Sequence, residues 1–174
     1  MSNIIHELPD LWYVLHTKSR AEKVVHDLLT KKAIESFLPT ALVRSKRKDR
    51  RVMLDLPLFP GYVFVKTDLY AEHYLSILKT PGAVKLIGNK SGPIAVADSI
   101  VESLQIMVHS GESIVTGNQF VTGERVKVIR GPFTDVTGIF SDYKGKGRVI
   151  VFIDLLGQSA SVEVDEEDIE RILE

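Results

Sequence analysis

The most informative hydrophobic pattern of this chain lies near its middle, where residues 57–65 read Pro-Leu-Phe-Pro-Gly-Tyr-Val-Phe-Val. Side chains alternate along a strand, so Tyr62 and Phe64 share one face while Val63 and Val65 share the other. The run therefore predicts a strand that is apolar on both faces. One face can form the core, and the other is either covered by a helix or offered, with its aromatic side chains, to another macromolecule.

Upstream of this run, β-forming segments alternate with amphipathic helical patterns. Residues 11–17 are rich in β-formers and predict a strand, and the apolar positions after Ser19 recur at helical spacing and predict a helix. Residues 37–39 begin a second predicted strand, with Pro39 at an edge or at the strand start.

Downstream of it, Asp68 is the predicted N-cap of a helix over residues 69–79, and residues 84–87 predict a short strand. Ser99 and Glu102 predict a capping box for a further helix, and Gly111 fits the position just beyond its end. The order of elements predicts an α+β domain over residues 9–111, with a largely antiparallel sheet flanked by helices.

The pattern changes after residue 111. Residues 112–121 are polar and lack helical periodicity, so they predict a linker. Beyond it, short alternating runs are separated by Gly131-Pro132, by the Lys-Gly-Lys-Gly run at 144–147 and by Gly157. Short strands divided by such turns predict a small all-β domain over residues 122–174, an SH3-like barrel.

The net charge of −1 hides an asymmetry between the two parts. Residues 1–115 carry 15 Lys/Arg against 12 Asp/Glu, whereas residues 116–174 carry 7 against 11. Six cations and one acid fall within residues 44–51, between two predicted strands, and predict a basic hairpin tip. Such a tip can face phosphates, or it can be solvated charge that keeps the protein in solution.

The sequence lacks the residues and motifs that disulfide bonds, membrane insertion, glycine-rich phosphate loops and histidine metal sites would need. There is no cysteine, which suits a reducing interior, and no apolar run or N-terminal pattern of a membrane helix or signal peptide, so we expect a cytoplasmic protein with no membrane contact. Phosphate-binding glycine motifs and metal-ligand histidine spacings are missing. Residues 165–168 are acidic and could hold a hard cation or form a solvated end. We expect no enzyme activity, no cofactor and no metal.

Trp12-Tyr13-Val14, residues 57–65, Thr80-Pro81-Gly82 and the run from Gly123 to Gly138 together resemble the NusG family of bacterial transcription elongation factors. Residues 124–133, with Gly138 and residues 146–148, look like the KOW motif of that family. The resemblance covers nearly all of residues 11–173. It implies a non-enzymatic factor, which we expect to be a monomer. Its first domain would bridge the clamp helices of one large RNA polymerase subunit and the gate loop of the other, restraining the clamp and suppressing pausing.

The residues that match the polymerase-binding surface of the family are His16, Phe59, Tyr62, Phe64, His73 and Tyr74. The first four match an apolar concave surface for the clamp helices, and the last two match the helix start that meets the gate loop. An amphipathic helix in an apolar groove is a common mode of recognition, and aromatic side chains often dominate it. The resemblance therefore implies that Tyr62 and Phe64 face outward, while Trp12 and Leu58 pack inside the domain.

The resemblance also implies contact with upstream or non-template DNA. The matching basic residues are Lys18, Arg20, Lys23 and Lys31, and the hairpin tip adds Arg44, Lys46, Arg47, Lys48, Arg50 and Arg51. Neutralising phosphates would make this contact salt-dependent without giving it sequence specificity. A purely solvated tip remains the alternative.

The C-terminal domain of the family recruits other factors, usually the ribosomal protein that doubles as NusE. The residues expected to form that surface are Phe133, Val136, Leu155, Leu156 and Gln158. Where family members carry Ile-Phe-Gly-Arg for the helicase Rho, this chain has Leu-Leu-Gly-Gln at 155–158, which weakens the case for Rho recruitment. With the compact basic hairpin, this departure favours a specialised antiterminator of particular operons over a housekeeping factor. A KOW-type RNA- or ribosome-binding protein is the third hypothesis, and the acidic C-terminal part disfavours it.

Overall fold

The computed structural model describes residues 8–47, 49, 51–117, 123–143 and 146–172. The chain divides into two compact units. One consists of Met1–Leu38 and Pro60–Val96, and the other of Pro39–Phe59 and Ala97–Glu174. Each unit is described by itself below. The domain boundaries expected from the sequence, with a linker over residues 112–121, remain a prediction.

The first unit is built on a four-stranded sheet. Its strands are β1 (Leu11–Thr17), β2 (Ser36–Phe37), β5 (Tyr62–Thr67) and β6 (Ala83–Leu86), in the order β2-β5-β1-β6. Every pairing in it is antiparallel, as predicted. The predicted strands over residues 11–17 and after Gly61 are both confirmed, and they lie side by side at the centre of the sheet.

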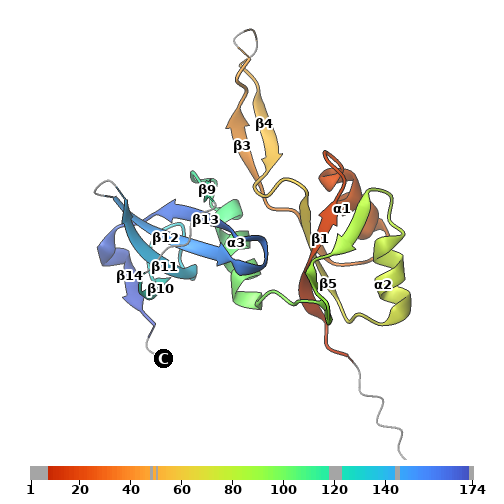
Figure 1. The fold of residues 1–174 in the computed structure, drawn as a ribbon. Helices are drawn as coiled ribbons and strands as arrows, with labels where there is room; N and C mark the ends of the chain where they lie inside the picture. The colour runs from red at the N-terminus through yellow and green to blue at the C-terminus, as the bar shows by residue number, and fades with distance from the viewer. Residues whose placement is uncertain (1–7, 48, 50, 118–122, 144–145, 173–174) are drawn as a thin grey trace, which may run out of the picture. The chain divides into compact units, whose positions relative to one another are not determined.

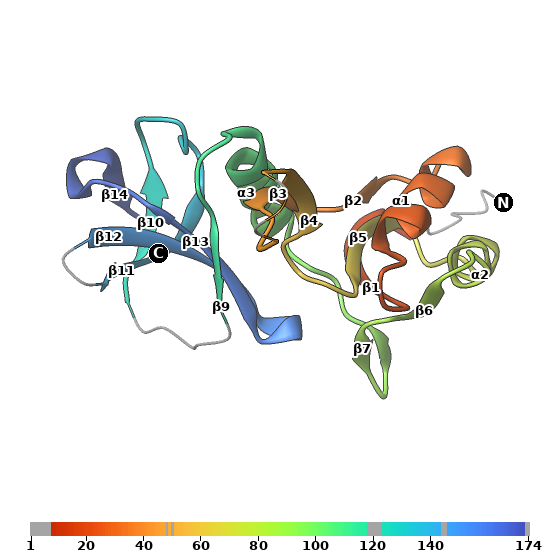
Figure 2. The same ribbon diagram turned by 90° about the horizontal axis from the view of Figure 1, so that it is seen from above.

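Helices α1 (Glu22–Lys31) and α2 (Ala71–Leu78) supply the apolar side chains that cover one face of this sheet (Figures 1 and 2). Alternation puts Tyr13 and Leu15 of β1 on that face, opposite the apolar stripe of α1. The core that results consists of Tyr13, Leu15, Val25, Leu29, Val65, Ile77 and Leu86. Burial of these side chains, rather than helix propensity, holds the two short helices in place.

The helix N-termini differ from those predicted. The N-caps are Ala21 for α1, Tyr70 for α2 and Ala97 for α3 (Asp98–His109), and none of them caps through its side chain. The predictions of an Asp68 cap and of a Ser99–Glu102 capping box are therefore wrong. Because packing of the apolar stripes fixes where each helix begins, a favourable local cap one or two residues away is left unused.

A short hairpin completes the first unit. Strands β7 (Gly88–Asn89) and β8 (Gly92–Pro93) pair with each other, and Trp12 of β1 forms an isolated antiparallel bridge with Val96. The bridge includes a hydrogen bond of 2.7 Å from the Val96 N–H to the Trp12 carbonyl. It holds the end of the unit against its central strand.

In the second unit, β3 (Thr40–Arg44) and β4 (Met53–Pro57) form a two-stranded antiparallel hairpin. The described basic residues Arg44, Lys46, Arg47 and Arg51 stand at or beside its turn, which confirms the predicted hairpin tip (Figure 1). Neither strand joins another sheet in the part of the chain that the structure describes.

The rest of the second unit contains a six-stranded antiparallel sheet in the order β14-β10-β11-β12-β13-β9. Its strands are β9 (Val115–Gly117), β10 (Arg125–Val128), β11 (Thr137–Tyr143), β12 (Lys146–Ile153), β13 (Gln158–Glu163) and β14 (Ile169–Arg171), with the short 3-10 turns η1 (Asp154–Leu156) and η2 (Glu166–Asp168) between them. The alternating runs thus form strands as predicted. The strand β9 falls within residues 112–121, where no strand was predicted.

Helix α3 contributes Val101, Leu104 and Met107 to the buried side chains of the chain. Ser103, on the same side of the helix, is also buried, and its Oγ accepts a hydrogen bond of 3.0 Å from the Thr137 N–H of β11. The helix ends at His109 with Ser110 as its C-cap, and Gly111 follows with φ +73°, as predicted for the position just beyond a C-terminus.

Candidate functional site

Three polar or aromatic side chains form a row across the sheet of the first unit. His16 of β1 stands directly opposite Tyr62 of β5 on one side and Lys85 of β6 on the other. Residues directly opposite in neighbouring strands share a face of the sheet. The His16 and Tyr62 rings are 5.5 Å apart between centroids and tilted by 35°, and both are half-buried, while Lys85 is exposed. The row thus offers two rings and one cation to solvent.

A buried carboxylate fixes the turn that leads into this row. The Gly61 N–H donates a hydrogen bond of 2.7 Å to Oε1 of Glu22, the first residue of α1 and a buried one. The Gly61 carbonyl in turn accepts a bond of 2.8 Å from the Thr17 N–H. Gly61 has φ +88°, a conformation that favours glycine. The role of Glu22 could not be predicted from local sequence patterns, because residue 22 lies 39 residues from residue 61 along the chain.

Two of the predicted surface aromatics are buried, which corrects the expectation that Phe64 faces outward. Phe64 has no exposed surface, and Phe59 exposes 1%. The physical reason is the position of β5 inside the sheet: Phe64 lies between Phe37 of β2 and Val14 of β1, with the two phenyl rings 6.0 Å apart. Tyr62 stays partly accessible because it begins the strand. Trp12 and Leu58 are buried, as predicted.

A second polar cluster precedes α2. Oδ1 of Asp68 accepts hydrogen bonds from the Tyr70 N–H at 3.0 Å and from Nδ1 of His73 at 2.7 Å. The bond to Asp68 is the main reason that the pKa of His73 is raised. Burial pulls the pKa of Asp68 upward, but the His73 and Tyr70 bonds outweigh it and the pKa is lowered. His73 is exposed, whereas the predicted partner Tyr74 is half-buried against the core.

The predicted nucleic-acid residues fall into two groups. Lys18, Arg20, Lys23 and Lys31 are exposed on or just before α1. In the hairpin tip the exposed cations are Arg44, Lys46, Arg47 and Arg51, while the predicted residues Lys48 and Arg50 lie outside the described residues. The two groups belong to different units, and each forms a local positive surface.

In the C-terminal sheet, the predicted factor-binding residues separate into core and surface. Phe133 exposes 5% and Val136 nothing, so the expectation that these two lie at the surface is wrong, and a binding role for them stays a prediction. Their place in a tight β10–β11 connection turns both side chains into the sheet core. Leu155, Leu156 and Gln158 are half-exposed around η1, where Gly157 adopts φ +60°. These three remain candidates.

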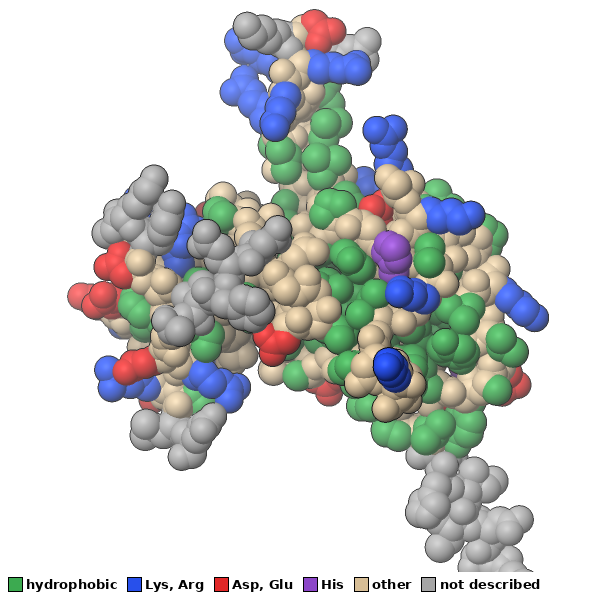
Figure 3. All heavy atoms as spheres, viewed as in Figure 1, with side chains coloured by type: hydrophobic (Ala, Val, Ile, Leu, Met, Phe, Trp, Pro, Cys, Tyr) green, Lys and Arg blue, Asp and Glu red, His purple; other side chains and the backbone are tan. Residues whose placement is uncertain are grey.

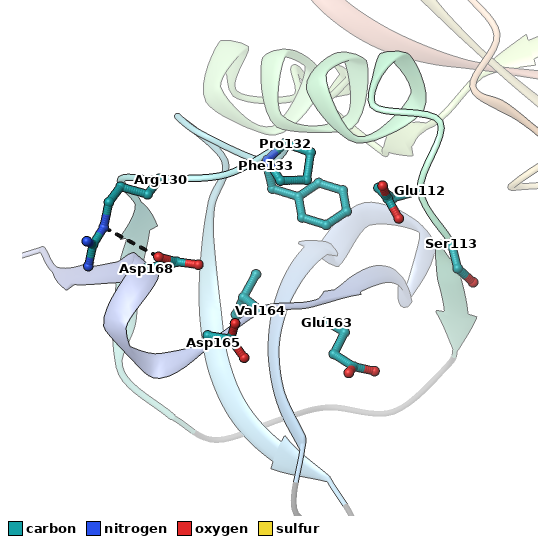
Figure 4. Close-up of a pocket in the computed structure, with 9 residues that line it drawn as sticks. All are labelled: Glu112, Ser113, Arg130, Pro132, Phe133, Glu163, Val164, Asp165 and Asp168. Atoms are coloured by element: carbon teal, nitrogen blue, oxygen red, sulfur yellow. Dashed lines mark ion pairs between the residues drawn. The ribbon is translucent and has the colours of Figure 1, made fainter.

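A hollow in the second unit has four acidic side chains and one cationic side chain among its nine lining residues (Figure 4). Its charged lining residues are Glu112, Arg130, Glu163, Asp165 and Asp168. Nε of Arg130 lies 3.4 Å from Oδ1 of Asp168, and its Nη2 donates to the Glu167 carbonyl. Asp165, Glu166 and Glu167 are exposed, and Asp168 is half-buried beside the exposed Arg130, so the acidic run at 165–168 is largely solvated, which is one of the two alternatives expected from the sequence. A polyanion would meet repulsion here.

Among the described residues, no three His, Cys, Asp or Glu side chains are grouped closely enough to hold a metal ion. The same part of the chain has no helix with the length and apolar character needed to cross a bilayer. What the arrangement can do is bind other macromolecules, through the His16–Tyr62–Lys85 row, the two basic surfaces and the half-exposed η1 region.

Comparison with known proteins agrees with this arrangement. A family model described as "Transcription termination factor nusG" matches residues 10–105. The "Transcription termination/antitermination protein NusG" of Pseudomonas aeruginosa is 30% identical over 92% of this chain and 98% of its own length. The protein of the same name from Borreliella burgdorferi is 29% identical over 92% of this chain and 98% of its own.

A solved structure described as "Domain interaction in Thermotoga maritima NusG" shares the fold. It has a TM-score of 0.54 at 21% identity and covers 96% of this chain and 99% of that one. The family model matches more than half of the residues, and the Pseudomonas aeruginosa relative is 30% identical along almost the whole length. Both comparisons indicate the same family. This chain belongs to the NusG family.

Proposed function

We propose that this protein is a non-enzymatic transcription elongation factor that binds RNA polymerase across the DNA channel and suppresses pausing and termination. Membership of the NusG family supports the class of function. The observation that carries the mechanism is the His16–Tyr62 pair, two half-buried rings on neighbouring strands, of which the second follows the Gly61 turn held by Glu22. A pre-ordered aromatic pair loses little conformational freedom on binding, which suits an interface anchor.

His16 and Tyr62 are proposed to contact the clamp helices, and the α2 start with His73 to meet the gate loop. Phe64, which is buried between β1 and β2, is proposed to stiffen the strand that carries Tyr62. The factor then acts by adding binding free energy to the closed, elongating state of the polymerase. A few kcal/mol of differential affinity is enough to shift such an equilibrium by orders of magnitude.

The exposed cations around α1 and at the hairpin tip are proposed to contact upstream or non-template DNA. Each group is accessible, and phosphate contacts need no sequence-specific geometry. The six-stranded sheet is proposed to close as an SH3-like barrel and to recruit the ribosomal protein NusE through Leu155, Leu156 and Gln158. Its acidic hollow is an argument against RNA binding by this part.

Within the family we propose a specialised antiterminator. The support is the Leu-Leu-Gly-Gln run at 155–158, which offers Rho neither an aromatic ring nor a cation, together with the compact basic hairpin. The alternative is a housekeeping NusG that acts with Rho and the ribosome, and the names of the relatives favour it. Transcription of long, pause-containing templates with and without Rho separates the two, because the specialised factor is expected to be indifferent to Rho.

The polymerase contact is tested by measuring the Kd of the full-length chain for core RNA polymerase. We expect His16→Ala and Tyr62→Ala each to weaken binding by about tenfold or more, as for an interface hot spot. His109→Ala is the matched control, since His109 is exposed at the end of α3 and bonds only locally, to the Gln105 carbonyl. Equal affinities for wild type and both site variants would refute this docking surface.

A further inference from the structure

The β3–β4 hairpin exposes an unusual amount of aliphatic surface. Its exposed large hydrophobic residues are Leu42, Val43, Val52, Met53, Leu54 and Leu56, and each is at least 42% accessible. Figure 3 shows hydrophobic side chains along the narrow stalk at the top of the view, with Lys and Arg side chains above them. The proposed function uses the cationic tip and assigns no role to the stalk.

The strand register places most of this surface on one face. Val43 stands opposite Leu54, and Ala41 opposite Leu56. Val52 follows on the same side, two residues from Leu54, and its carbonyl accepts the Ser45 N–H at 2.9 Å. The side chains at Ala41, Val43, Val52, Leu54 and Leu56 are called the aliphatic face below. None of them can donate or accept a hydrogen bond, and none is aromatic.

This chemistry favours a protein as the occupant over a nucleic acid. Bases are recognised by hydrogen bonds to their edges or by stacking on aromatic rings, and the aliphatic face supplies neither. A contiguous exposed apolar surface is instead the usual mark of a protein contact. The exposed cations Lys46, Arg47 and Arg51 border the face at its far end. A complementary protein surface is therefore aliphatic and edged by carboxylates.

The size of the aliphatic face indicates what kind of contact it makes. Five aliphatic side chains expose on the order of a few hundred Å², which is the size of the largest apolar patch on an ordinary monomer. A stable stand-alone interface needs about 800 Å² from each partner. The face is too small to hold a second copy of this chain or a separate partner by itself. It suits an auxiliary contact to a protein that is already anchored elsewhere.

We propose that the aliphatic face is a second docking surface for RNA polymerase, where it packs on an aliphatic surface edged by carboxylates. This inference rests on the proposed function, in which His16 and Tyr62 provide the anchor. The hairpin then acts as an arm whose stalk adds affinity through burial of apolar area.

The test is the Kd of full-length chain for core RNA polymerase, measured with the double variant Val43→Thr/Val52→Thr. Threonine keeps the shape and β-branching of valine and adds a hydroxyl, so the hairpin itself is preserved. The matched control is Val84→Thr/Val115→Thr, at two exposed strand valines of 45% and 47% accessibility outside the hairpin. We expect about a fivefold to tenfold weaker Kd for the hairpin variant and a change below about twofold for the control.

Salt dependence provides a second readout. Apolar burial persists as the salt concentration rises, whereas phosphate or carboxylate pairing weakens. The loss of affinity for core RNA polymerase caused by Val43→Thr/Val52→Thr is therefore expected to be the same at low and high salt. Circular dichroism and thermal unfolding check that both double variants remain folded.

Each other outcome overturns the inference in a distinct way. An unchanged Kd for Val43→Thr/Val52→Thr, while Tyr62→Ala still weakens binding, refutes the arm and leaves the proposed function standing. Absence of wild-type binding refutes both. A hairpin variant that loses affinity for forked DNA and keeps its affinity for polymerase identifies a nucleic acid as the occupant. A loss of self-association in analytical ultracentrifugation identifies a second copy.

Discussion

The carboxylate of Glu22 accepts a hydrogen bond of 2.7 Å from the backbone N–H of Gly61, across 39 residues of sequence. Glu22 exposes 6% of its surface, so the bond is shielded from water. It joins the first residue of α1 to the turn that places Tyr62 beside His16. The proposed polymerase anchor is therefore positioned by a residue that does not belong to it.

We expect Glu22→Ala to lower the free energy of unfolding by about 1–3 kcal/mol, because the Gly61 N–H loses its partner in a shielded site. Glu22→Gln keeps an acceptor oxygen, so its free energy of unfolding should fall clearly less than that of Glu22→Ala. Urea unfolding of the three proteins measures this. Equal losses for the glutamine and alanine variants would show that the bond itself contributes nothing.

The Asp68–His73 pair predicts a pH dependence. The pKa of His73 is raised above its ordinary value of 6.5, so the stability it contributes is fully present below about pH 6.5 and is lost as the pH rises through the raised value. The pKa of Asp68 is lowered from 3.8, so its contribution is present above that value and is lost as the pH falls through the lowered one. The pair therefore contributes most between about pH 4 and pH 6.5.

NMR titration of the His73 ring checks this expectation. Asp68→Asn should lower the pKa of His73, and the stability difference between wild type and Asp68→Asn should be larger at pH 5.5 than at pH 8. A His73 titration that does not respond to Asp68→Asn would exclude the pairing in solution.

Thr17 carries a buried hydroxyl without a hydrogen-bond partner among the described residues. Its side chain is 2% exposed at the end of the central strand β1. Replacing it by valine removes an unsatisfied polar group and keeps the shape, so Thr17→Val should leave stability unchanged or raise it by about 1 kcal/mol. Thr17→Ser keeps the hydroxyl and loses the methyl group, and it should destabilise. Thermal unfolding compares them, and a clear loss in the valine variant would point to an ordered water on the hydroxyl.

Gly138 permits close contact between β11 and β12. A Cβ atom at this position would lie 2.3 Å from the Ile150 carbonyl oxygen and 3.0 Å from Cγ1 of Val149. Gly138→Ala must push the two strands apart, and we expect a loss of about 3 kcal/mol in the stability of the C-terminal sheet. Gly117→Ala is the control, because a Cβ there meets nothing closer than 3.8 Å. Unfolding followed through strand-specific amide exchange distinguishes the two, and equal protection would contradict the steric argument.

Local pattern was sufficient for most of the element list. The alternation of apolar residues predicted β1 and β5, helical spacing predicted α1, and the cation-rich run predicted the hairpin tip. Each of these patterns is contained within a few consecutive residues. The family resemblance also stood, since its motifs are contiguous runs. Helix caps were predicted less well, because cap preference is worth about 1 kcal/mol and core packing outweighs it.

Which face of an apolar strand is exposed to solvent could not be predicted from the residues of that strand. Alternation assigns Tyr62 and Phe64 to the same face of the strand. Phe64 is nevertheless buried between Val14 and Phe37, while Tyr62 is only half-buried at the strand end. Phe133 and Val136 were likewise expected at a surface and are buried. Accessibility depends on which strands become neighbours, and that choice involves residues far away in the chain.

The sequence by itself determined the identity of the elements, their order, the charge of each part and the family, since all of these follow from residues near one another along the chain. Tertiary structure alone decided which aromatic rings are accessible, that Glu22 holds Gly61, and that Lys85 joins His16 and Tyr62 in one row. The physical reason is that burial and hydrogen-bond pairing are properties of contacts between distant segments. Local preference constrains the backbone of each segment, and only the packed sheet fixes which side chains it leaves in water.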